Sequence, residues 1–395
     1  MGNTMSLKVL EAFEKKFGDA KGVHCFFAPG RVNLIGEHTD YNGGHVLPCA
    51  LSIGTYAAVR VRDDRRLRFF SLNFEDEGII EGSLDDLTYD SKKAFSNYPL
   101  AVVWALGQNG YEVPFGLDIA FFGDIPYCSG LSSSASVEVL TGFACRELFS
   151  FDLDLVSLAR ICMQAENEFV GVNCGIMDQF ASAMGKRDYA IFLDTGTLDY
   201  EYIPVKFDGV SLVIACSNKK RGLSDSKYNE RRRECEEALR YLREFKDINS
   251  LCELSEEEFD ELCGFIPDPV CQIRARHAVL ENIRTAKACE ALKRNDTAEF
   301  GHLMNESHLS LRDDYEVTGA ELDTLVETAW TVPGVLGSRM TGAGFGGCTV
   351  SLVENNVVDN FIQTVGEVYL RKIGYRADFY VAETGDGPCE LSEKI

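Results

Sequence analysis

The sequence predicts a mixed α/β (α+β) fold in two domains. Its 395 residues and apolar content of 45% are enough for two hydrophobic cores. Strand-like runs of β-branched and aromatic residues alternate with helix-like apolar periods along most of the chain. Turn residues and short apolar segments mix at 202–209, which is where we expect the first domain to end. We therefore predict an N-terminal domain of residues 1–205 and a C-terminal domain of residues 206–395.

Each predicted element follows from the local spacing of apolar residues. Residues 6–17, for example, place Leu7, Leu10, Phe13 and Phe17 at helical spacing with charges between them, and Gly18 follows. The other predicted helices are 94–109, 137–149, 155–169, 230–240, 254–262, 268–291, 296–311 and 319–329. The predicted strands are 24–28, 51–62, 67–74, 117–122, 189–194, 210–216, 349–353 and 378–381, the last of which we expect to end the fold.

Two predictions concern how these elements are connected. Strands 51–62 and 67–74 flank the polar turn 63–66, so we expect them to pair antiparallel with each other. The segment 78–89 is polar and is predicted to be a loop.

The net charge of −23 disfavours general binding to nucleic acids or anionic membranes. It leaves room for a nucleotide site, because such a site needs only a local positive pocket. The 14 cysteines are scattered without a C-x-x-C pair. The sequence shows no signal segment and no apolar run long enough for a bilayer. We therefore expect a cytoplasmic protein with reduced thiols and with no membrane or nucleic-acid partner.

A serine-rich loop, GLSSSAS at 130–136, lies between strand 117–122 and helix 137–149. The backbone N–H groups and the dipole at a helix N-terminus favour an anion. The natural ligand is a phosphate, with a serine hydroxyl free to reach a magnesium ion. The alternative is an ordinary serine N-cap on a buried helix.

A second loop, residues 28–44, holds four glycines, Arg31, Glu37, His38 and Asp40. Closely spaced hydrogen-bonding groups of this kind suit a polyol ligand. The alternative is a solvated surface turn with a hairpin at 42–44. The apolar residues within the loop favour partial packing and so favour the ligand site.

Three further features concern charge and backbone. Asp178 has apolar neighbours and so needs a partner, for which Arg31 is the candidate; the alternative is a helix N-cap or a buried acceptor. The basic stretch 217–233 offers Lys220 or Arg221 to a phosphate, although 230–240 also fits a charged helix face. The glycine-rich turn 338–348 matches neither a Walker loop nor G-x-G-x-x-G, but its backbone could approach a ligand closely.

These motifs, in this order, resemble those of the GHMP kinases, the superfamily named after galactokinase, homoserine kinase, mevalonate kinase and phosphomevalonate kinase. The residues at 30–44 resemble the signature of its galactokinase family, and so do 175–179, 226–235, 307–316 and 339–348. The resemblance covers nearly the whole chain. It implies a ribosomal S5-like N-terminal domain, a ferredoxin-like C-terminal domain and an active site between them.

The resemblance also implies an activity. The γ-phosphoryl group of MgATP would move to the anomeric hydroxyl of α-D-galactose, giving galactose 1-phosphate and ADP at the entry to the Leloir pathway. The expected partners are galactose and ATP, with Mg²⁺ as the cofactor, in a monomer or weak oligomer. Other activities stay open: a kinase for N-acetylgalactosamine or arabinose, or a regulator that binds galactose and ATP without turnover. The intact Ser134-Ala135 pair and Asp178 favour catalysis.

The residue roles implied by the resemblance fall into four groups. Asp178 and Arg31 would be catalytic. The sugar would be bound by Glu37, His38, Asp40, Gly175 and Tyr228. The nucleotide would be bound by Phe95, Gly130, Leu131, Ser132, Ser133, Ser134, Gly342 and Gly344. Magnesium would be held by Ser134 and Glu166.

Two positions depart from the family pattern. Relatives usually have glycine at the position of Cys128, so a side chain there could crowd the phosphates. They tend to have tryptophan at the position of Phe95, so the expected adenine pocket keeps a stacking face but loses an N–H donor.

Overall fold

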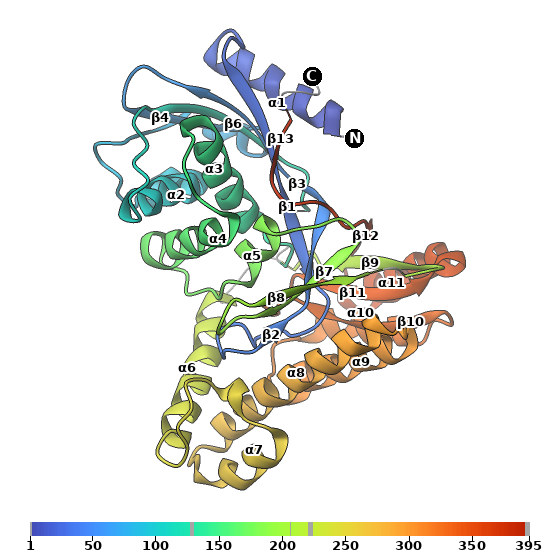
Figure 1. Ribbon diagram of the computed structural model, residues 1–395. Helices are drawn as coiled ribbons and strands as arrows, with labels where there is room; N and C mark the ends of the chain where they lie inside the picture. Colours follow the sequence, from blue (N-terminus) through green and yellow to red (C-terminus); the bar gives the residue numbers. More distant parts are fainter. Residues whose placement is uncertain (1, 127–129, 206, 220–223, 392–395) are drawn as a thin grey trace.

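The computed structural model describes residues 2–126, 130–205, 207–219 and 224–391, which form three sheets with helices packed around them (Figure 1). The largest sheet has six strands in the order β13-β1-β3-β6-β4-β5. Its strands are β1 Val23–Asn33, β3 Pro48–Val61, β4 Arg66–Ser71, β5 Ile80–Ser83, β6 Leu117–Gly123 and β13 Cys389–Glu390. Neighbours run antiparallel except β4 and β6, which run parallel.

Strand alternation divides the six-stranded sheet between two cores. Cys25, Tyr56 and Ala58 face one way and pack against the helix α1, Gly2–Phe17. Their chain neighbours, including Phe26 and Ala57, face the other way and pack against the helices on the second face. These helices are α2 Asn97–Gln108, α3 Ser133–Phe149, α4 Leu155–Gln164 and α5 Met177–Ala183. The sheet is therefore buried on both faces. The first turn of α3 is fixed to β1 and β3, because the Ser136 hydroxyl donates to the Ala28 carbonyl at 2.8 Å and accepts the Thr55 N–H at 3.1 Å.

The second sheet has four strands in the order β10-β11-β9-β12. They are β9 Val210–Cys216, β10 Val335–Thr341, β11 Cys348–Glu354 and β12 Asp378–Ala382. Two helices, α8 Pro269–Lys293 and α9 Thr297–Asp313, share one core with this sheet, and α10 Ala320–Trp330 and α11 Val358–Ile373 share the core on its other face. Helices α6 Ser224–Leu242 and α7 Glu256–Leu262 pack beside α8 at the end of the molecule remote from α1 (Figure 1). No described helix is both long and apolar enough to cross a membrane.

The third sheet is small and joins the two larger layers. It contains β2 His45–Val46, β7 Tyr189–Asp194 and β8 Tyr200–Pro204. The last described residues also return to the six-stranded sheet, where β13 pairs with β1 at Phe26 and Phe27. The chain beyond β12 thus packs against strands from the N-terminal third, while the division at residues 205 and 206 stays a prediction.

The predicted pairing of strands 51–62 and 67–74 is wrong, because β6 lies between β3 and β4. Asp118 of β6 gives a physical reason for this order. Its carboxylate accepts hydrogen bonds from Arg60 and Arg62 on the β3 side at 2.9 and 2.8 Å, and from Arg68 of β4 at 2.6 and 2.8 Å. Asp118 is 1% exposed, so the strand that carries it is held where arginines from both neighbours can neutralise it.

Other differences concern the extent of elements. The predicted loop 78–89 contains β5, and strand 378–381 is followed by β13 rather than ending the fold. Helix 94–109 begins only at Asn97, after a 3₁₀ segment at Ser91–Ser96, and helix 155–169 changes to a π-helix at Ala165–Val170. Helices α5 and α11 and strands β2, β8 and β10 were not predicted. Short strands such as β2 and β8 carry too few residues for a period of two to stand out.

Candidate active site

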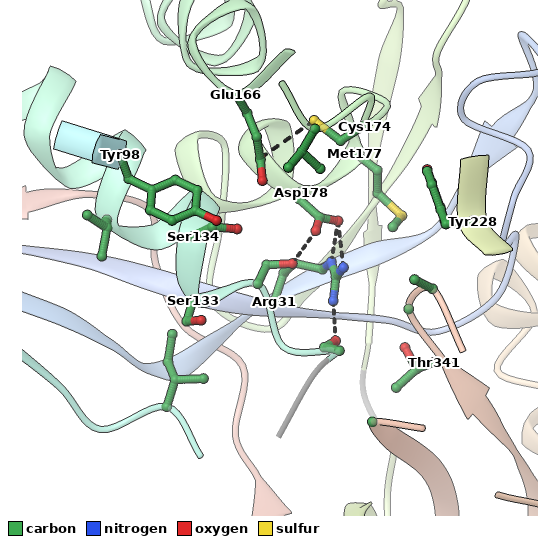
Figure 2. Close-up of a pocket in the computed structure, with 18 of the residues that line it drawn as sticks. Arg31, Tyr98, Ser133, Ser134, Glu166, Cys174, Met177, Asp178, Tyr228 and Thr341 are labelled. Atoms are coloured by element: carbon green, nitrogen blue, oxygen red, sulfur yellow. Dashed lines mark hydrogen bonds and ion pairs between the residues drawn. The ribbon is translucent and has the colours of Figure 1, made fainter. Parts of the chain in front are cut away.

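A cavity of about 600 Å³ brings the three predicted loops together. Its walls come from the end of β1, the N-terminus of α3, the start of α5, the α6 helix and the glycine turn after β10. All the residues to which the resemblance assigns a role, except Leu131, line it. Figure 2 shows Arg31 and Asp178 pointing at each other in its centre, with Ser133, Ser134 and Tyr98 on one side and Tyr228 on the other.

Arg31 and Asp178 form the central ion pair, as the sequence predicted. The Arg31 Nε and Nη2 atoms lie 2.7 and 2.6 Å from Asp178 Oδ1, and Nη1 donates to the Gly130 carbonyl. Ser132 Oγ donates to the other carboxylate oxygen, Oδ2. Asp178 lies in the first turn of α5 and is 28% exposed, whereas the Arg31 side chain is 4% exposed. A buried cation thus orients a carboxylate that still reaches the cavity.

The serine loop forms the N-terminus of the 17-residue helix α3, which begins at Ser133. Ser132 occupies the N-cap position, but its side chain makes no capping bond, because its hydroxyl bonds Asp178. The alternative of an ordinary serine cap is therefore not what the structure has. Helix termini leave their first N–H groups without intrahelical partners, so this one suits an anion.

Leu131 is the one predicted nucleotide residue whose side chain turns away. It is fully buried in the core that contains Val32 and Ile125, and its carbonyl accepts the backbone N–H of Arg31 at 3.2 Å. Its apolar character explains this placement, and its contribution to the cavity is the backbone contact that holds Arg31.

The glycine turn after β10 approaches the serine loop closely. Gly342 has a φ of +86°, and a Cβ there would lie 3.0 Å from the Gly130 Cα. A side chain would therefore push the two loops apart, which explains the glycine. Gly342 and Gly344 both line the cavity, as predicted.

Glu37 sits beneath this turn and is 1% exposed. Its carboxylate forms an ion pair with Arg339 and accepts the Gly342 N–H at 3.0 Å and the Thr341 hydroxyl at 3.2 Å. Burial raises the pKa of Glu37, and the Arg339 charge opposes that rise. Arg339 is itself fully buried, and no feature of the sequence linked it to Glu37, which lies about 300 residues earlier.

The Asp40 carboxylate packs directly against the backbone of Gly175. A Cβ on Gly175 would lie 2.0 Å from Asp40 Oδ2, so only glycine leaves room for this carboxylate. Burial, and then the charge of Asp178, raise the pKa of Asp40 from 3.8 to about 7. A perturbed carboxyl in a cavity is a common feature of binding and catalytic sites.

His38 and Tyr228 complete the same wall. His38 has a φ of +64°, and its Nδ1 lies 2.8 Å from the Tyr41 hydroxyl. Its ring centroid is 5.7 Å from that of Tyr228 and 4.8 Å from that of Tyr315. Burial, and then the nearby His277, lower the pKa of His38 to about 3, so this imidazole is neutral near pH 7.

The opposite end of the cavity is aromatic. Phe95 stacks on Phe74 with centroids 5.6 Å apart and meets Phe121 edge-on at 6.2 Å. Tyr98, which Figure 2 shows beside Ser134, also lines the cavity. The sequence singled out Phe95 through the resemblance alone, and Phe74 and Tyr98 carried no signal because isolated aromatic residues are usual in cores.

Glu166 faces the cavity from the π-helix, and Ser134 at the N-terminus of α3 lines the same cavity. Gln179 Nε2 donates to Glu166 Oε2 at 2.7 Å. Burial, and then the charge of Asp178, raise the pKa of Glu166 to about 7. Among the described residues no three His, Cys, Asp or Glu side chains gather as a metal site. A hydroxyl and a carboxylate nevertheless fit Mg²⁺, which binds through one or two carboxylates together with phosphates and waters.

Some predicted residues lie outside the described part of the chain, namely Cys128, Lys220 and Arg221. Lys219, which precedes two of them, is described and lines the cavity, and its Nζ is 3.0 Å from Glu321 Oε2. The sequence did not distinguish it from the other basic residues in 217–233.

Comparisons with known proteins agree with this geometry. The galactokinase galactose-binding signature matches residues 11–61, the N-terminal domain of GHMP kinases matches 97–186 and their C-terminal domain matches 288–369. The chain is 55% identical over 384 residues to a galactokinase of Clostridium beijerinckii, covering 97% of this chain and 98% of that one. The chain belongs to the galactokinase family.

Solved structures support the same family. The galactokinase of Lactococcus lactis, in a structure complexed with galactose, is 48% identical, with a TM-score of 0.95 over 97% of this chain and 99% of that one. A mevalonate kinase matches with a TM-score of 0.63 at 17% identity, over 92% of this chain and 98% of that one, and so shows the shared fold alone. The GHMP kinase fold predicted from the sequence is confirmed, and as a member of the galactokinase family the protein is an ATP-dependent sugar kinase.

Proposed function

We propose that this protein transfers the γ-phosphoryl group of MgATP to the anomeric hydroxyl of α-D-galactose, giving galactose 1-phosphate and ADP. The observation that carries the proposal is the position of the Arg31–Asp178 pair. It lies in one cavity between the loop with Glu37, His38 and Asp40 and the N-terminus of α3. A polyol at the first and a phosphate at the second would place a sugar hydroxyl and a phosphoryl group on either side of Asp178.

On the sugar side, Glu37, His38, Asp40 and Tyr228 supply hydrogen-bonding groups, and Gly175 leaves the space that the Asp40 carboxylate needs. The Arg339 ion pair and the Gly342 N–H hold Glu37 in one orientation. Fixed acceptors select a sugar by the direction of its hydroxyl groups, because an unmatched buried acceptor costs free energy.

At the reacting atoms, Asp178 accepts the proton of the attacking hydroxyl or orients its oxygen. Arg31 holds the carboxylate in place and offsets the negative charge of the transition state. Phosphoryl transfer depends mainly on positioning and electrostatics, so one fixed carboxylate and one fixed cation are effective.

On the nucleotide side, the N–H groups of Ser133 and Ser134 and the turn with Gly342 and Gly344 would cradle the phosphates. Phe95 offers its ring to the adenine. Ser134 and Glu166 would hold Mg²⁺. When bound, this ion neutralises phosphate charge and orients the phosphates.

The deciding experiment is a coupled assay of ADP release with galactose, N-acetylgalactosamine, glucose and arabinose. We expect the highest kcat/KM with galactose, and phosphorus NMR should identify the product as the 1-phosphate. A higher kcat/KM with another sugar would overturn the assignment of galactose as the substrate. Binding of galactose and ATP with no ADP released would instead identify a regulator.

Gly175→Ala is expected to raise KM for galactose by about 10- to 100-fold, with a smaller change in kcat. The new methyl group would displace the Asp40 carboxylate, which lies 2.0 Å from the position of that Cβ. Steady-state kinetics with varied galactose measures the change. Gly107→Ala is the control, because a Cβ there meets nothing within 4 Å. An unaltered KM in Gly175→Ala would remove Asp40 from the sugar site.

Asp40→Asn is expected to stabilise the ligand-free protein at pH 8 and to abolish its stabilisation by galactose. The pKa of Asp40 is raised from 3.8 to about 7, so its ionisation costs more free energy in the folded protein than in the unfolded chain. That penalty is absent below about pH 4, grows as the pH rises to about 7 and is constant above it.

Thermal unfolding between pH 4 and pH 8 measures this effect. The Tm of Asp40→Asn should exceed that of the wild type by about 2 °C or more at pH 8, and the difference should shrink towards pH 4. Equal Tm values at pH 8 would show that the Asp40 carboxyl carries no such penalty.

A further inference from the structure

A buried amide connects two carboxyl groups behind the cavity. Gln179 of α5 is fully buried, and its Nε2 donates to Glu166 Oε2 at 2.7 Å and to Glu138 Oε2 at 3.0 Å. Glu138 comes from α3 and is also fully buried, while Glu166 comes from the π-helix. Three elements that are separate in the sequence therefore meet at one side-chain amide.

The amide binds the side of Glu166 that faces the protein interior. Glu166 Oε2 accepts the Gln179 amide and lies 3.5 Å from Cys174 Sγ, a contact drawn in Figure 2. Glu166 and Ser134 both line the cavity. The carboxylate is thus held from behind while it faces the cavity.

The backbone of Glu166 is held as well. Its carbonyl accepts N–H groups from both Gly171, at 3.0 Å, and Val172, at 3.1 Å, at the end of the π-helix. A π-turn is uncommon and is frequently found at functional sites.

Packing alone does not explain this cluster. Replacing buried charged or polar groups with apolar ones of similar shape is often neutral or stabilising, so a buried Glu–Gln–Glu set gains little for the core. Groups that hydrogen-bond a metal ligand from behind, by contrast, commonly set its orientation and contribute 10- to 100-fold to metal affinity.

We propose that Gln179 is a positioning residue that holds Glu166 in the orientation needed for the divalent cation, with Glu138 fixing Gln179 from the far side. This proposal rests on the proposed role of Glu166 in holding Mg²⁺. Neither Gln179 nor Glu138 lines the cavity, so both act through Glu166 rather than on the substrates.

The test is Mn²⁺ affinity in the presence of ADP, measured by electron paramagnetic resonance. Gln179→Met keeps the length of the side chain but removes both donated hydrogen bonds, and we expect it to weaken Mn²⁺ binding by about 10-fold. Its galactose-induced rise in Tm should equal that of the wild type, because the sugar wall is untouched. A merely structural role would not separate these two readouts.

The Glu138 variants provide a rescue pair. Glu138→Met removes the acceptor for Gln179 and should weaken Mn²⁺ binding, whereas Glu138→Gln retains an acceptor and should restore most of the affinity. Gln272→Met is the matched control, because Gln272 also donates a side-chain hydrogen bond, to the Ile266 carbonyl at 2.6 Å, but lies on α8. It should bind Mn²⁺ as the wild type does.

Glu166→Gln tests separately whether Glu166 holds the metal ion and whether Gln179 positions Glu166. If this variant binds Mn²⁺ with wild-type affinity, the proposed metal site is wrong. If it loses affinity while Gln179→Met does not, the metal site stands and the positioning role is overturned. Should Gln179→Met fail to fold, equal Mn²⁺ affinity in Glu138→Met and Glu138→Gln would overturn the proposal in its place.

Discussion

Asp178→Asn lowers kcat by at least about 100-fold while galactose still binds, which is the largest effect that we expect in this protein. The amide keeps the shape of the carboxylate and can still accept from Arg31. It cannot take up a proton from the sugar hydroxyl, and it lacks the charge that pairs with Arg31. The measurements are kcat from ADP release and the galactose-induced shift in Tm.

The control for this change is Asp386→Asn, whose carboxylate pairs with Arg187 on the surface at 3.4 Å. It should keep wild-type kcat. Near-normal kcat in Asp178→Asn would contradict the assignment of Asp178 as the catalytic carboxylate. Loss of galactose binding would show that the main role of Asp178 is to bind the sugar.

Arg31→Ala is expected to lower kcat by about 100-fold or more and to change KM for ATP much less. The substitution removes the hydrogen bond from Nε and the ion pair from Nη2 to Asp178 Oδ1, together with the hydrogen bond to the Gly130 carbonyl. Asp178 then loses its counter-charge, and of the hydrogen bonds described above it keeps only the one from the Ser132 hydroxyl. The transition state also loses a nearby cation. Kinetics with varied ATP at saturating galactose separates the two parameters.

Arg60→Ala is a fair comparison, because Arg60 also pairs with a buried carboxylate, Asp118, which keeps Arg62 and Arg68 as partners. We expect it to leave kcat unchanged. An Arg31→Ala enzyme with unchanged kcat would contradict the proposed role of Arg31, and a change confined to KM for ATP would place Arg31 in nucleotide binding.

Much of the fold could be read from local patterns. Strands β7 and β9 and the main helices follow from apolar periods that belong to each segment alone. The order of the strands could not be read in this way. β6 lies between β3 and β4 because Asp118 needs arginines from both neighbours, and that pairing joins residues about 50 positions apart.

The sequence likewise predicted some features of the site and not others. The serine loop, the loop with Glu37 to Asp40 and the glycine turn were each visible in the sequence, because a loop rich in glycine and hydrogen-bonding side chains is unusual wherever it occurs. Leu131 shows the limit of that approach. Its position in the motif predicted a nucleotide contact, but an apolar side chain beside a buried strand goes to the core.

The sequence by itself determined which chemical groups are present, and it offered Arg31 as the candidate partner of Asp178, since a carboxylate among apolar residues needs a partner. Only the tertiary structure decided what holds those groups in place. Arg339, which pairs with Glu37, and Gln179, which bonds Glu166, lie in stretches that resemble the family, but nothing in the sequence linked either residue to its partner. Their roles arise from contacts between distant segments, and such contacts depend on how the sheets and helices pack rather than on any local pattern.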